Sequence, residues 1–199
     1  EKKFKLYEDL VRPYSISRKT EVAIFPEERR YTIKADYVLK NGGEQPITKV
    51  FVTQRLPLET IAIENANLVT HDSVYGIYIF QFEKPLQPNH TVGYNFELKH
   101  HHKGYEEDKT IVNNGTYITH TNFEPILGYS SGLEITDKVE REKRNLPKRE
   151  VEIISDEHIA LEDFNNEKTD FETIVSTSSK QTALSSGNLV KKWSENNKN

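Results

Sequence analysis

The sequence of 199 residues contains neither cysteine nor methionine. Without cysteine the chain can form no disulfide and no thiolate metal site, and its redox compartment is left open. Because it begins at Glu1 and lacks the initiating methionine of a natural reading frame, we expect a piece of a longer protein or a processed form. No apolar run approaches the length of a membrane span, and no secretory signal peptide is present.

Several standard catalytic motifs are missing as well. HExxH, the Walker A pattern, GxGxxG and CxxC do not occur, so the chain lacks the constellations of zinc proteases and nucleotide enzymes. A formal net charge of −4 gives no electrostatic reason to expect nucleic-acid binding. The residues alone therefore predict a binding or scaffolding module rather than a complete enzyme.

What the sequence does contain is a series of short strand patterns separated by Gly, Pro and Asn turns. Residues 31–40 and 91–99 alternate strictly between apolar and polar, which is typical of half-buried antiparallel strands. Residues 74–83 are apolar on both faces, so this strand should be covered on both sides. Further strands are expected at 21–25, 47–54, 61–63, 67–70 and 170–176. The fold predicted is all-β, an antiparallel β-sandwich.

The ends and one insertion depart from this pattern. Residues 1–15 are predicted to be a polar lead-in with a short helix, and residues 16–199 the sandwich domain. The charged stretch 136–145 predicts one surface helix, with Asp137–Arg141 and Glu140–Arg144 pairs at i,i+4 spacing. A strand at 150–154, an acidic loop at 156–168 and a turn between short apolar runs at 183–190 complete the prediction.

One stretch, from Thr116 to Gly132, carries a candidate binding residue. Four side chains that can form hydrogen bonds (residues 119–122) precede Glu124 and Pro125. Proline disfavours helix at the preceding residue, so Glu124 should be extended. A carboxylate held there can bind a cation, or it can be a solvated loop charge, and local sequence leaves both interpretations open.

Other clusters favour structural interpretations. His100 and His102 would share a strand face and are weak candidate metal ligands, but two neighbouring positions do not close a site, and a strand end leading into a turn is favoured. The acidic groups at 106–108 and 162–163 are expected to be solvated. Aromatic residues between 75 and 105 follow strand periodicity, so we favour a core over a carbohydrate-binding platform, which would require a row of exposed aromatics.

Three segments carry a family resemblance. THTNFEPILGY (residues 119–129) resembles the TQFEPTDAR segment of aminopeptidase N-type zinc metallopeptidases, the gluzincin family that includes leukotriene hydrolase. Residues 171–190, with TALSSGNLV, are similar to that family's strand pair ending in TALSNGNLV, and PLQPNHTVGYNFEL lies upstream in the matching order. The resemblance covers residues 16–199 and implies a β-sandwich that packs on a catalytic domain.

The resemblance also implies roles and a setting. Glu124 matches the family's amine-binding glutamate and Asn122 its glutamine, so both would bind a peptide substrate; zinc would belong to a domain beyond residue 199, and this fragment would be no enzyme. The ARxxFPCxDEP segment is replaced by a charged insertion. That variant resembles the branch fused to bacterial ABC transporter permeases, which implies a membrane-anchored parent with this part extracytoplasmic; a cytoplasmic placement is the alternative. The rival function is a non-catalytic interaction module of an envelope or transporter complex.

Overall fold

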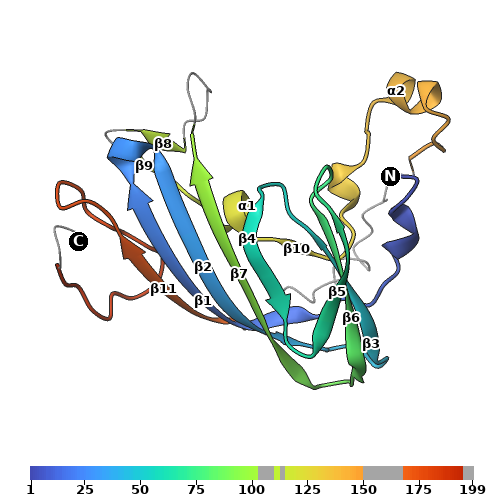
Figure 1. The fold of residues 1–199 in the computed structure, drawn as a ribbon, viewed down its shortest axis with the longest axis horizontal. Helices are drawn as coiled ribbons and strands as arrows, with labels where there is room; N and C mark the ends of the chain where they lie inside the picture. The colour runs from blue at the N-terminus through green and yellow to red at the C-terminus, as the bar shows by residue number, and fades with distance from the viewer. Residues whose placement is uncertain (103–109, 113–114, 150–167, 195–199) are drawn as a thin grey trace, which may run out of the picture.

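The computed structural model describes residues 1–102, 110–112, 115–149 and 168–194. Two β-sheets lie face to face, meet at the end that carries the β6–β7 turn and diverge at the other end (Figure 1). The larger sheet has the strand order β11-β1-β2-β7-β4, and the smaller β10-β3-β6-β5. The pairings within both sheets are antiparallel, except that β11 runs parallel to β1. The predicted all-β sandwich is confirmed.

The strands are β1 (Tyr14–Phe25), β2 (Arg30–Lys40), β3 (Ile47–Thr53), β4 (Leu58–Ile63), β5 (Ala66–Asp72), β6 (Ile77–Leu86), β7 (Thr91–His101), β8 (Ile111–Val112), β9 (Gly115–Thr116), β10 (Ile126–Leu127) and β11 (Asp170–Ser176). The helical segments are η1 (Lys5–Tyr7), η2 (Pro26–Glu28), α1 (His120–Phe123), η3 (Ser131–Leu133) and α2 (Lys138–Lys143). A two-stranded sheet pairs β8 with β9.

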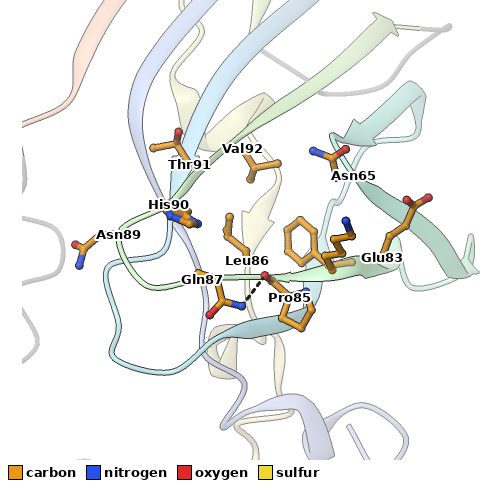
Figure 2. Close-up of a pocket in the computed structure, with 11 residues that line it drawn as sticks. Asn65, Glu83, Pro85, Leu86, Gln87, Asn89, His90, Thr91 and Val92 are labelled. Carbon is orange, nitrogen blue, oxygen red and sulfur yellow. Dashed lines mark hydrogen bonds between the residues drawn. The ribbon is translucent and has the colours of Figure 1, made fainter.

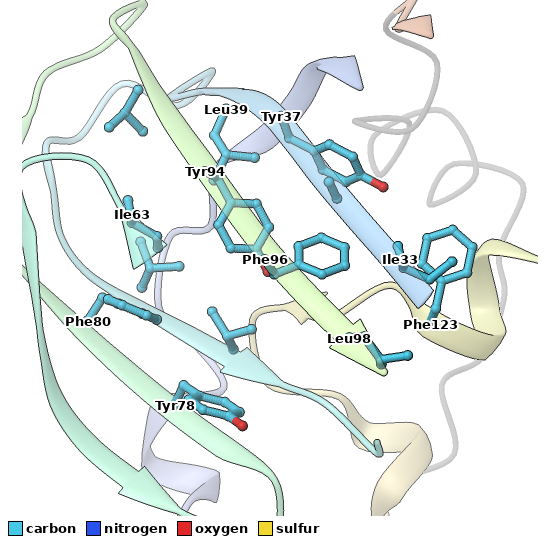
Figure 3. Packing of buried hydrophobic residues seen from close by; sticks show 14 of the residues in the cluster. Ile33, Tyr37, Leu39, Ile63, Tyr78, Phe80, Tyr94, Phe96, Leu98 and Phe123 are labelled. Atoms are coloured by element: carbon cyan, nitrogen blue, oxygen red, sulfur yellow. The ribbon is translucent and has the colours of Figure 1, made fainter. Parts of the chain in front are cut away.

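The main core lies between the sheets and follows the alternation of β2 and β7. The inner residues of these strands are almost fully buried: Tyr31, Ile33, Ala35, Tyr37, Leu39, Val92, Tyr94, Phe96 and Leu98. Phe80 and Val52 of the smaller sheet and Phe123 of α1 belong to the same cluster, part of which is drawn in Figure 3. Each of the larger apolar side chains contributes roughly 1.5–3 kcal/mol by leaving water, so the period-2 pattern is what fixes both strands.

The β6 strand is covered on both faces, as predicted. Its inner residues join the main core, while Ile77 and Ile79 face outward and form a second cluster with Phe4 and Phe51. Phe4 lies in the amino-terminal segment and is only 5% exposed. Residues 1–10 therefore supply the layer that covers the smaller sheet. The predicted start of this strand is wrong, because Val74 and Tyr75 lie in an exposed turn before it.

The charged insertion is tied to the amino terminus through Arg141. Its guanidinium forms two hydrogen bonds with the Glu1 carboxylate, at 2.7 and 3.1 Å, and donates to the carbonyls of Ile135 and Pro147. Arg141 is 3% exposed and Glu134, 3.8 Å from it, is 7% exposed. Charges this deeply buried are tolerated only when paired, so this network joins residues separated by 140 positions.

Glu134 is stabilised as a carboxylate within the same network. Burial by itself raises the pKa of Glu134. Hydrogen bonds from Lys5 Nζ at 2.9 Å and the Tyr129 hydroxyl at 2.8 Å, together with the charges of Lys5 and Arg141, lower the pKa by more than burial raises it, so the net shift is downward. The hydrogen bond to Glu134 in turn raises the pKa of Lys5.

The helix within the insertion is shorter than predicted. α2 spans six residues, and the Asp137 side chain accepts a hydrogen bond from the Glu140 N–H at 2.8 Å. The predicted Asp137–Arg141 pair is therefore wrong, because Asp137 caps the helix and Arg141 turns toward Glu1. The predicted Glu140–Arg144 pair is confirmed. Aspartate at a helix start satisfies an otherwise unpaired N–H, which decides this outcome.

The carboxy-terminal part confirms one prediction and corrects another. Residues 170–176 form β11 as expected. Residues 181–194 form no strand, so the second strand implied by the family resemblance is wrong, whereas the turn predicted within 183–190 is confirmed by a bend at Gly187 (φ 99°). The strand at 150–154, the loop at 156–168 and the acidic groups at 106–108 and 162–163 lie outside the described residues. Within the described part of the chain, no helix is long and apolar enough to span a bilayer.

Candidate functional site

The predicted binding segment is built around one helical turn, α1. Thr119 precedes it in an extended conformation, and the Asn122 side-chain oxygen accepts hydrogen bonds from the Thr119 N–H and hydroxyl, each 2.8 Å long. The turn stops at Phe123, and Glu124 is extended (φ −75°, ψ 127°) before Pro125. The predicted extended conformation of Glu124 is confirmed, and its cause is the proline that follows.

The segment is fastened to the smaller sheet by Gln54, which follows β3. Its buried side-chain amide donates to the Phe123 carbonyl at 2.5 Å, and its oxygen accepts from the Arg55 N–H at 2.7 Å. Just after Glu124, the short strand β10 pairs with β3 through Ile126 and Leu127. The main chain around Glu124 is therefore held by hydrogen bonds from the smaller sheet. No sequence signal marks Gln54, because its partner is a carbonyl 69 positions away.

The Glu124 carboxylate itself is directed to the larger sheet. Its Oε2 accepts a hydrogen bond from Arg18 Nη1 at 3.1 Å, and the Glu124 side chain is 14% exposed. Burial raises the pKa of Glu124; the charges of Arg18 and His120 oppose this, and the net shift is upward. The interpretation as a freely solvated loop charge is therefore wrong. Arg18 was missed because the strand containing it was predicted to start only at residue 21.

Two tyrosines of the larger sheet complete the surroundings. Arg18 lies opposite Tyr37 in the β1–β2 register, and its guanidinium carbon is 5.7 Å from the centre of that ring. Burial, followed by the nearby Glu124 charge, raises the pKa of Tyr37 to about 12. Burial, followed by the electrostatic influence of Tyr37 and Glu124, raises the pKa of Tyr94. The arrangement is a carboxylate with one guanidinium partner and neutral phenols beside it, which suits the binding of an organic cation.

The Tyr94 hydroxyl has no hydrogen-bond partner among the described residues, although the side chain is 2% exposed. An unsatisfied buried hydroxyl costs about 1–3 kcal/mol. We therefore expect Tyr94→Phe to raise the free energy of unfolding by about 1 kcal/mol, measured by urea denaturation. Tyr37→Phe is the matched control, because the Tyr37 hydroxyl lies 3.4 Å from Thr20 Oγ1. Destabilisation by Tyr94→Phe would contradict the expectation.

The two other sequence candidates occupy different settings. Asn122 is exposed, and its oxygen already accepts two hydrogen bonds from Thr119, which leaves its NH₂ group for a ligand. The rings of His100 and His102 lie 4.5 Å apart, edge to face, as expected for one strand face, and His102 is buried. Among the described residues no three His, Cys, Asp or Glu side chains are grouped to hold a metal ion.

An open groove of about 650 Å³ lies beside the β6–β7 turn. Asn65 and Glu83 stand on one side and Asn89 and His90 on the other (Figure 2). A hydrogen bond from the Gln87 amide to the Pro85 carbonyl, 3.1 Å long, belongs to the turn itself. None of the residues predicted from sequence to bind a ligand lines this groove.

Comparison with solved structures gives a match of fold. No protein-family model matches the sequence, and no curated protein matches it. An M1 zinc metallopeptidase from Deinococcus radiodurans superposes with a TM-score of 0.51 at 13% identity, covering 94% of this chain and 37% of that one. A variant of the same enzyme gives 0.50, again at 13% identity over 94% and 37%. The likeness is one of fold. The chain spans little more than a third of these peptidases.

Proposed function

We propose that the chain is a non-catalytic, amino-terminal domain of an aminopeptidase-like zinc metallopeptidase region, which caps the active-site cleft and in which Glu124 binds the free amino group of a peptide. The observation that carries the proposal is the Glu124 carboxylate, largely buried and fixed in an extended segment. It lies on a fold like that of an M1 peptidase. Asn122 contributes by capping the helical turn that places Glu124.

The partner in this proposal is a downstream domain of the same protein, which would hold the zinc ion. Large apolar side chains near the end of the described chain support such a contact. They are exposed to between 49% and 96%: Phe171, Leu184, Leu189, Val190 and Trp193. Exposed apolar groups of this kind are typical of surfaces that another domain covers. A membrane-anchored, transporter-associated parent with this domain outside the cytoplasm is part of the same proposal and rests on the sequence resemblance.

The proposal is tested by Glu124→Gln in the full-length protein. Affinity for a tripeptide with a free amino terminus should fall about thirtyfold or more, the equivalent of about 2 kcal/mol, because a neutral amide replaces the partner of an ammonium. Calorimetry measures this affinity under conditions in which the peptide is not hydrolysed. Affinity for the N-acetylated tripeptide should not change.

The matched control is Glu97→Gln on β7. This substitution removes a carboxylate from an exposed ion pair with Lys34 of β2, in which the two charged groups are 3.9 Å apart. It should leave both affinities unchanged. Equal affinity of the wild-type protein for the free and the acetylated peptide would refute the amine-binding role. The favoured function would then be the alternative, a non-catalytic interaction module of an envelope or transporter complex.

A further inference from the structure

The contact between Arg18 and Glu124 uses only one oxygen of the carboxylate. Arg18 Nη1 lies 3.1 Å from Oε2, and no hydrogen bond to Oε1 forms within the described part of the chain. A guanidinium can bind both oxygens of a carboxylate in parallel. Here it does not, so one oxygen of a carboxylate that is still 14% exposed stays available to a second cation.

Arg18 is held in place by structure on both sides. β1 lies between β2 and β11, and Arg18 is registered opposite Tyr37 on one side and Phe171 on the other. Its guanidinium rests over the Tyr37 ring. A residue paired on both sides cannot change register without moving the whole strand, so the sheet fixes the main chain of Arg18 and the face from which its side chain extends.

The groups that interact electrostatically with Glu124 come from four elements. They are Arg18 of β1, His120 of α1, Tyr37 of β2 and Tyr94 of β7. The two tyrosines are neutral at physiological pH and add no positive charge. His120 is exposed and carries a charge only when protonated. Arg18 is thus the one permanent positive charge in this group.

We propose that Arg18 is a positioning residue of the amine site: it holds Glu124 through Oε2, keeps the carboxylate ionised, and leaves Oε1 to accept the substrate ammonium. This inference rests on the proposed function. Its physical basis is that burial favours the neutral acid, which attracts an ammonium far less than a carboxylate does. Arg18 therefore assists cation binding although it carries the same sign of charge as the substrate.

The test compares Arg18→Gln with Arg18→Lys in the full-length protein. Loss of the charge in Arg18→Gln should raise the pKa of Glu124. This pKa is measured by NMR of the side-chain carboxyl group, and Glu124→Gln assigns the signal. Between the wild-type and variant pKa values the variant is protonated, so its affinity for the free-amino tripeptide should fall about tenfold there. The affinity should recover as the pH rises through the higher pKa. Lysine keeps the charge and should restore most of the wild-type profile.

His120→Gln removes the neighbouring histidine and should leave the difference between the two Arg18 variants in place. An unchanged Glu124 pKa in Arg18→Gln would overturn the inference. Tighter amine binding in that variant would overturn it too, since Arg18 would then be a competitor. If the Glu124 pKa rises in Arg18→Gln but the wild-type protein binds free and acetylated peptides equally, the amine-binding role of Glu124 fails, and the Arg18 inference fails with it. The pKa and the peptide affinities therefore show which of the two proposals has failed.

Discussion

Arg141→Met is expected to lower the stability of the amino-terminal layer by about 3–5 kcal/mol, the usual cost of removing one partner from a buried ion pair. The substitution keeps an apolar stem of similar length but leaves the Glu1 carboxylate without its two hydrogen bonds. It also removes the donor to the Ile135 and Pro147 carbonyls. Native-state hydrogen exchange measures the effect at the Lys5 and Leu146 amides.

Arg144→Met is the matched control on the same helix. Arg144 is half exposed and pairs with Glu140 at i,i+4 spacing. Exposed pairs of this kind contribute only about 0.3–0.5 kcal/mol. If both variants cost the same small amount, the buried network would not be what fastens residues 1–10 to the sheet.

Gly76→Ala is expected to cost on the order of 2–5 kcal/mol in the free energy of unfolding, from left-handed backbone strain and from overpacking. Gly76 has a φ of 63°, and a Cβ atom there would lie 1.8 Å from the Gln54 carbonyl oxygen. The Gly76 carbonyl also accepts the Gln54 N–H at 2.8 Å, so neither main chain can retreat without breaking this bond. Urea denaturation followed by circular dichroism gives the value.

Gly115→Ala provides the comparison, because a Cβ atom at Gly115 meets nothing within 4 Å. It should change the unfolding free energy by no more than about 1 kcal/mol. A similar small change for Gly76→Ala would mean that the β5–β6 turn relaxes freely, which would contradict the close approach to Gln54.

The sequence predicted the parts of the fold that depend on local periodicity. The alternation in β2 and β7 placed nine side chains in the core, and the two-sided apolar pattern of β6 correctly required cover on both faces. The position of Glu124 before proline predicted its backbone conformation. In each case the residues that determine the local structure lie within a few positions of the residue concerned, so a short stretch of sequence is enough to predict that structure.

The rest depends on partners that are distant in sequence. Arg18 and Glu124 are 106 positions apart, and Arg141 and Glu1 are 140 apart. Helical spacing suggested Asp137 as the partner of Arg141, but a buried carboxylate from the other end of the chain satisfies more of the guanidinium than an exposed neighbour can. The topology of the sheets decides which of these distant charges come together, and the spacing of residues along the sequence does not reveal the pairing.

Glu124 is attached to both layers of the molecule. Its backbone is tied through Phe123 to Gln54, which follows β3 of the smaller sheet, while its side chain is tied to Arg18 of the larger sheet. Any movement that separates the two sheets at their diverging end would stretch the second attachment and spare the first. The ionisation of Glu124 therefore depends on a contact between the two layers, because the charge of Arg18 opposes the upward shift of the Glu124 pKa that burial causes.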